Sequence, residues 1–157
     1  MENYLKLRPT KTIFRDEEVT RLREVAISKL KEKLLPDDKI VKISLIGSSI
    51  KKSFGQYAPP GFRGSLYSDF DFIVFVEDDY VIPKWLDREP NGKPFSDNAM
   101  NLAYRNKKFV DNKFDIEVFF LRRKSFENKL IQKEGEVAGL PMSENTANKY
   151  LSVNIID

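Results

Sequence analysis

Two aspartates, Asp69 and Asp71, stand at the start of an apolar run in the segment LYSDFDFIVFV (residues 66–76). In an extended strand, residues two apart point to the same face, so these two carboxylates lie side by side. Like charges this close repel and raise each other's pKa, and a divalent cation between them cancels the repulsion. The pair therefore predicts a metal site, although solvated charges at the start of a strand remain the alternative.

A second acidic pair, Asp115 and Glu117, repeats this spacing near the start of the segment FDIEVFFL (residues 114–121). If the two strands are neighbours, a third carboxylate from this pair joins the first two. Three oxygen donors on rigid strands suit one or two Mg²⁺ or Mn²⁺ ions with open positions for phosphate oxygens.

The composition excludes much other chemistry, because the 157 residues include no cysteine and no histidine. Disulfides, thiolate nucleophiles, zinc sites built on Cys or His, and Ser-His-Asp triads are impossible, and oxygen atoms must hold any metal.

The net charge of +3 mildly favours an anionic partner. No apolar run is long enough to span a membrane, and MENYLKLRPTK at the start has no secretory pattern. We therefore expect a cytoplasmic protein with no membrane partner.

A turn suited to an anion is predicted between KIVKISLIG (residues 39–47) and SSIKKSF (residues 48–54). The first segment predicts a strand that stops at Gly47, and the second predicts a short helix that begins at Ser48. The N–H groups of a first helical turn bind anions, and Lys51 and Lys52 add positive charge one turn later. We expect Gly47, Ser48 and Lys51 to bind phosphate, with Lys52 as a secondary candidate. A solvated helix face is the alternative for the two lysines.

These motifs, in this order, resemble those of the DNA polymerase β-type nucleotidyltransferase superfamily. The matching segments, which cover roughly residues 38–121, are Leu45-Ile46-Gly47-Ser48, Ser68-Asp69-Phe70-Asp71-Phe72-Ile73-Val74 and Phe114-Asp115-Ile116. The resemblance implies an enzyme with a two-ion Mg²⁺ or Mn²⁺ site that transfers a nucleoside monophosphate from a nucleoside triphosphate to an acceptor hydroxyl, releasing pyrophosphate.

The resemblance also assigns roles to residues. Gly47 and Ser48 would hold the triphosphate, and Asp69 and Asp71 would ligate both ions. The family's pattern favours Asp115 over Glu117 as the third ligand. Asp115 would ligate one ion and also help to activate the attacking hydroxyl. Glu117, Lys52, Arg63 and Ser68 are secondary candidates.

Two departures from the family's pattern concern the second substrate. Residues 49–68 separate Ser48 from Asp69 by more chain than compact members have, and the excess is a Pro- and Gly-rich loop. The helical lobe that many members use to bind base or acceptor is also missing, so a second copy or a helical partner protein is expected to supply it. The acceptor is an RNA, a protein or a small molecule.

Two other function classes remain as alternatives. One is a non-catalytic nucleotide- or nucleic-acid-binding module that keeps the fold. The other is a glycosyltransferase, which also uses Asp-x-Asp to hold a metal, but there the apolar strand usually precedes the acidic pair and the Gly47-Ser48 turn has no role.

The elements that must position these residues predict an α/β (α+β) fold with a mixed central sheet flanked by helices, forming one nucleotidyltransferase-like domain over residues 1–157. The N-terminal helix, residues 16–34, carries an apolar stripe at helical spacing. Strands are expected at 39–47, 69–77 and 114–121, helices at 48–54, 97–108 and 122–135, a loop at 55–68, an excursion at 78–97, and a strand or arm in the tail. The core is about residues 38–121, and the C-terminal helix and tail are residues 122–157.

Overall fold

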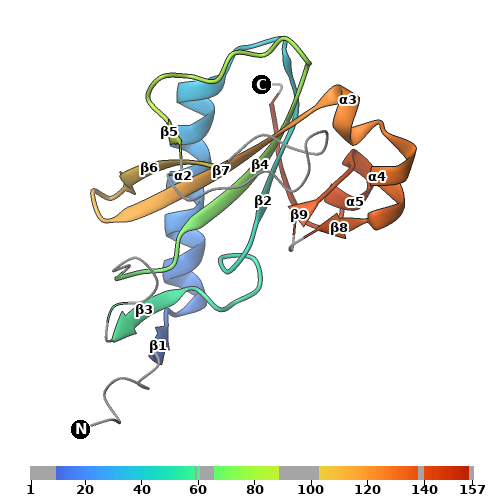
Figure 1. Ribbon diagram of the computed structural model, residues 1–157. Helices are drawn as coiled ribbons and strands as arrows, with labels where there is room; N and C mark the ends of the chain where they lie inside the picture. Colours follow the sequence, from blue (N-terminus) through green and yellow to red (C-terminus); the bar gives the residue numbers. More distant parts are fainter. Residues whose placement is uncertain (1–9, 59, 61–65, 89–102, 138–139, 156–157) are drawn as a thin grey trace, which may run out of the picture.

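A computed structural model describes residues 10–58, 60, 66–88, 103–137 and 140–155 of the chain (Figure 1). The fold is mixed α+β and is built on a mixed sheet, as the sequence predicts, and this sheet has six strands. The strands lie in the order β10 (Leu151–Val153), β2 (Ile40–Ile46), β4 (Phe70–Val76), β7 (Phe114–Arg122), β6 (Ala103–Val110) and β5 (Asp87–Arg88). Strands β4 and β7 are parallel, and the other neighbours are antiparallel. Among the described residues, no helix has the length and apolar character needed to cross a membrane.

One face of the sheet is covered by helix α2 (Asp16–Leu34), which has the predicted bounds. Its apolar stripe is buried against the side chains that β4 and β7 direct to this face. Acidic residues occupy the first turn of the helix and lysines the last, which complements the helix dipole. The members of this main core include Val19, Leu22, Ala26, Leu30, Leu34, Phe70, Phe72, Val74, Ile116, Val118 and Phe120.

The opposite face packs against a C-terminal layer, drawn in orange and red in Figure 1. This layer comprises α3 (Arg123–Phe126), α4 (Lys129–Glu134), β8 (Glu136–Val137), β9 (Leu140–Pro141) and α5 (Glu144–Ala147). Its apolar residues, led by Phe126 and Met142, bury Ile73 and Phe75 in the second half of β4. The start of β4, on the same face, carries Asp69 and Asp71. The strand is thus apolar where the layer covers it and acidic where the candidate site lies.

Two predictions between residues 48 and 58 are wrong. Residues 48–52 form hydrogen-bonded turns rather than a helix, with the N–H groups of Ile50 and Lys51 both 3.1 Å from the Gly47 carbonyl. The positive φ of 59° at Lys52 prevents the turn from continuing as a helix. Residues expected in a loop form β3 (Gly55–Ala58), because the N-terminal strand β1 (Thr10–Ile13) pairs with them.

The helix predicted over residues 97–108 is also wrong for its described part, which is strand β6. Residues 97–102 lie outside the described residues. Asp111 and Asn112 both have φ near 54° in a turn closed by a 3.0 Å bond from the Lys113 N–H to the Val110 carbonyl. This turn folds β6 back against β7, and pairing within the sheet outweighs the segment's weak helical preference.

The helix predicted over residues 122–135 is interrupted and forms α3 and α4. Asn128 lies at the break, where its side-chain Oδ1 accepts the N–H of Leu130 over 2.9 Å. An asparagine in this role caps the start of a new helix, which favours a break there over a continuous helix. Gly135, with φ of +70°, follows α4 at the predicted end.

Candidate metal centre

Three carboxylates from the two central parallel strands come together at the start of β4. The parallel register sets Asp71 opposite Glu117 on β7, and Asp69 lies two residues before Asp71 on the same face. One oxygen from each of Asp69, Asp71 and Glu117 lies within 4.8 Å of the other two. Oxygen atoms grouped in this way suit a hard cation such as Mg²⁺ or Mn²⁺.

The Asp71 carboxylate lies in an electrostatic environment that disfavours its charge. Burial raises the pKa of Asp71 well above its usual range, and the charges of Asp69 and Glu117 raise it further, while Arg105 lowers it. A divalent cation would offset both the lost hydration and the repulsion. The electrostatics of the group therefore fit a metal ion.

Gly47 brings the predicted phosphate turn directly against this group. Its neighbour Ile46 pairs with Asp71 in the β2–β4 ladder. Gly47 has φ of +80°, and a Cβ placed on it would collide with Asp71 Oδ2 and lie 3.2 Å from Asp71 Cβ and Cγ. Only glycine satisfies both the backbone conformation and this close approach.

Arg105, in the segment predicted to be helical, is an unexpected member of the site. Its Nη2 lies 3.0 Å from Asp69 Oδ2 and 3.2 Å from Glu117 Oε2, and its Nη1 lies 3.1 Å from Asp115 Oδ2. Burial alone would lower the pKa of the Arg105 guanidinium, but its carboxylate partners raise it. The Arg105 side chain therefore stays protonated and positively charged among the acids.

Asp115, favoured from the family pattern as third ligand, lies beside the group of three rather than within it. Its Oδ1 accepts the backbone N–H of Lys108 over 2.9 Å, and its Oδ2 faces Arg105. Lys108 has φ of 55° and lies in a bulge of β6, where the pairing with β7 shifts register. Asp115 thus holds the bulge and the arginine, and the β4–β7 register brings Glu117 to Asp71 instead.

The predicted phosphate-binding lysines lie at the surface. Lys51 and Lys52 are exposed, and Lys52 Nζ lies 3.9 Å from Asp16 Oδ2. Hydrogen bonds from Tyr150 and Lys149 lower the pKa of Glu136, and the charge of Lys51 contributes less. The positive charge of Lys51 is thus felt at the C-terminal layer.

The remaining predicted residues have separate positions. Ser48 is half-buried in the turn, and its carbonyl accepts the Ser53 N–H. Ser68 is buried, and its Oγ accepts the Gly55 N–H over 3.0 Å, which fastens β3 to the start of β4. This bond gives Ser68 a structural role. Arg63 lies outside the described residues.

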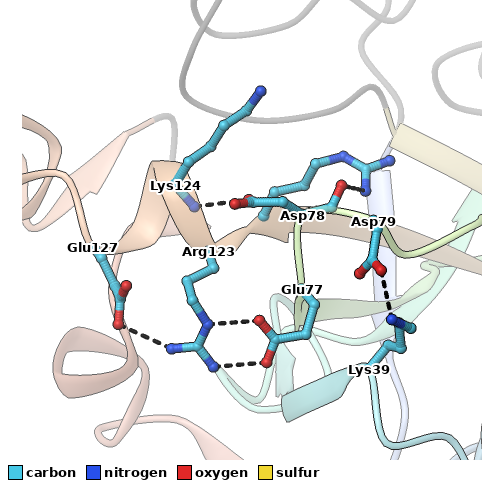
Figure 2. Close-up of polar contacts among 8 residues, drawn as sticks. Lys39, Glu77, Asp78, Asp79, Arg123, Lys124 and Glu127 are labelled. Carbon is cyan, nitrogen blue, oxygen red and sulfur yellow. Dashed lines mark hydrogen bonds and ion pairs between the residues drawn. The ribbon is translucent and has the colours of Figure 1, made fainter.

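A second polar cluster lies at the opposite end of the same two strands (Figure 2). Arg123 donates two hydrogen bonds to the Glu77 carboxylate, at 2.7 and 2.8 Å, and a third to Glu127. The Lys124 N–H donates to Asp78, and Arg122 donates to the carbonyls of Asp78 and Tyr80. Each acid here has a cationic or N–H partner. These contacts hold the loop that follows β4 in place.

The two ends of the sheet differ in how their contacts are arranged: each acid of the second cluster has a cationic or N–H partner, whereas one arginine is shared at the start of β4. At the start of β4, one arginine faces four carboxylates, those of Asp69, Asp71, Asp115 and Glu117, among the residues that the structure describes. Such a group of acids beside a glycine turn can bind a divalent cation together with an anionic ligand. Comparisons with protein-family models, with curated proteins and with solved structures find no match to this chain.

Proposed function

We propose that the protein is a divalent-metal-dependent nucleotidyltransferase with a nucleotidyltransferase fold. It would transfer a nucleoside monophosphate from a nucleoside triphosphate to an acceptor hydroxyl. The acceptor oxygen bonds to the α-phosphorus as the bond from that phosphorus to the pyrophosphate oxygen breaks, and the hydroxyl proton passes to a carboxylate of the site. Pyrophosphate leaves with the charge of the broken bond.

The observation that carries this proposal is the grouping of Asp69, Asp71 and Glu117 on parallel neighbouring strands, with Gly47 packed against Asp71. A metal-bound triphosphate needs carboxylates and a glycine turn in contact, because the metal would take carboxylate oxygens of the protein and phosphate oxygens of the nucleotide as ligands. The raised pKa of Asp71 supports the same assignment, since a cation offsets the repulsion on a partly buried carboxylate among other acids.

The residues have distinct roles under this proposal. Asp69, Asp71 and Glu117 would hold Mg²⁺ or Mn²⁺, which supplies charge neutralisation for the phosphates when bound. Asp115 positions the β6 bulge and Arg105. The glycine at position 47 leaves room for the backbone to approach a phosphate, and Ser48 would contribute its hydroxyl there.

The test is calorimetric titration of Mg²⁺ and Mn²⁺, alone and with each non-hydrolysable nucleoside triphosphate. We expect the metal to bind and to strengthen nucleotide binding, and the double variant Asp69→Asn/Asp71→Asn to lose both effects. Asp38→Asn, which changes an exposed acid remote in sequence from the site, is the matched control and should bind as the unchanged protein does.

Metal-independent nucleotide binding, or binding that survives the double substitution, would refute the proposal. Transfer itself is tested by incubating α-labelled triphosphates with RNA, proteins and small hydroxylated compounds. Metal-dependent binding with no transfer to any of them would identify the alternative, a non-catalytic nucleotide-binding module.

A further inference from the structure

Arg105 lies among the carboxylates that would hold the proposed metal ion. Two of its ion-pair partners, Asp69 and Glu117, belong to the group of three carboxylates that can share a cation. The arginine side chain is only 15% exposed, and those of its two partners are 21% and 20% exposed. The guanidinium is therefore enclosed with the acids and acts as their internal counter-ion.

A guanidinium paired with these carboxylates competes with a metal ion for them. Nη2 lies 3.0 and 3.2 Å from the Asp69 and Glu117 oxygens, whereas a bound Mg²⁺ lies about 2.1 Å from each oxygen ligand. Two cations that close together repel strongly in a partly buried site. The arginine in its present position therefore opposes metal binding, and its departure from these two carboxylates would favour it.

The arginine has a chemically matched destination if it leaves. A planar guanidinium binds phosphate oxygens in the same two-pronged manner as carboxylates. The glycine turn at position 47 lies against Asp71, in the same group. A phosphate bound between the metal and this turn would be within the neighbourhood that Arg105 already occupies.

We propose that Arg105 is an exchangeable counter-ion: a divalent cation displaces its guanidinium from Asp69 and Glu117, and the freed guanidinium then binds a phosphate of the incoming nucleotide. This inference rests on the proposed function, and it adds a residue that links metal binding to nucleotide binding. Arg105 opposes the metal and supports the nucleotide, so its removal changes the two affinities in opposite directions.

The experiment compares the unchanged protein with Arg105→Gln and Arg105→Lys. Calorimetry measures Mn²⁺ affinity without nucleotide, and then the affinity for a non-hydrolysable triphosphate at saturating Mn²⁺. For Arg105→Gln we expect Mn²⁺ to bind at least about tenfold more tightly, because a competing positive charge is gone. We expect the triphosphate to bind about tenfold more weakly, because a charged two-pronged donor is lost.

Arg105→Lys keeps the charge without the planar fork and should fall between the two proteins in both measurements. Arg123→Gln is the matched control, because it removes an arginine with comparable ion pairs at the other end of the sheet. It should alter stability but neither affinity. If Arg105→Gln does not fold, the same comparison is made with Arg105→Lys, whose smaller shifts keep the same signs.

Equal or weaker Mn²⁺ binding by Arg105→Gln would overturn the inference and would assign the arginine to holding the carboxylates in place. Metal binding by the variant but not by the unchanged protein would support it in the strongest form. If neither protein binds a divalent cation, the proposed function fails and this inference fails with it. If both bind the cation but Arg105→Gln does not bind it more tightly, only the exchange of Arg105 is refuted.

Discussion

Replacing Gly47 by alanine tests whether the glycine turn and the carboxylates form one packed unit. The positive φ at this position costs an alanine about 1 kcal/mol. The new Cβ would also collide with Asp71 Oδ2 and crowd its Cβ and Cγ at 3.2 Å, and such overpacking costs about 1–3 kcal/mol. We therefore expect Gly47→Ala to lower the free energy of unfolding by about 2–4 kcal/mol in the metal-free protein.

Gly135→Ala provides the matched control for this measurement. Gly135 has φ of +70°, but a Cβ placed on it meets no atom within 4 Å. Gly135→Ala should lower the free energy of unfolding only by the cost of a positive φ for alanine, about 1 kcal/mol. Urea unfolding with a chelator present gives both values, and their difference isolates the contact with Asp71.

A double substitution assigns that difference to the carboxylate. In an Asp71→Ala background the colliding oxygen and Cγ are absent, so Gly47→Ala should cost little more than Gly135→Ala. In an Asp71→Asn background an atom remains in place of the oxygen, so the full cost should persist. Equal losses for the two glycine variants, or no coupling to Asp71→Ala, would refute the packing argument.

Three further predictions concern titration and packing. Because the pKa of Asp71 is raised, the folded protein holds a proton that the unfolded chain releases, so this residue's contribution to stability falls as the pH rises from the ordinary carboxylate range through the raised pKa. Asp71→Asn should therefore stabilise the metal-free protein at neutral pH but not in acid, as measured by urea unfolding across pH; equal gains at every pH would contradict this. Leu30→Ala, in the main core, should lower the free energy of unfolding by about 2–5 kcal/mol, whereas Leu130→Ala, 74% exposed, should leave it nearly unchanged. Burial raises the pKa of Tyr80 to about 12, so Tyr80→Phe should remove one phenol that titrates near that pH in the ultraviolet; loss of a phenol with an ordinary pKa would contradict it.

The elements predicted correctly are those whose own residues decide their structure. The helix over 16–34 has an apolar stripe at helical spacing, and it forms with those bounds. The apolar runs predicted as strands at 69–77 and 114–121 form β4 (Phe70–Val76) and β7 (Phe114–Arg122), whose apolar side chains are largely buried. The segment at 103–110 has no such pattern, and its strand arises from pairing with β7, which a single segment does not reveal.

The candidate site divides in the same way. The i, i+2 spacing indicates that Asp69 and Asp71 share a face, and it allows Asp115 or Glu117 to join them. Only the register of β4 against β7 brings Glu117 to Asp71. Arg105 has no motif of its own; the Asp111–Asn112 turn would have suggested a hairpin, but the bulge near Lys108 determines that the arginine lies opposite Glu117.

Because of that bulge, the number of residues in the β6–β7 hairpin determines which residue of β7 lies opposite Arg105. Pairing continued from Val110 and Phe114 without it would set Arg105 opposite Phe119, two residues away from Glu117 along β7, or about 7 Å. Loss of a single residue there would instead turn the arginine to the other face of the sheet. Insertions and deletions near a hairpin tip are usually tolerated at a protein surface, but here they would separate the positive charge from the acids. Hairpin length is therefore expected to be inherited together with the acidic residues.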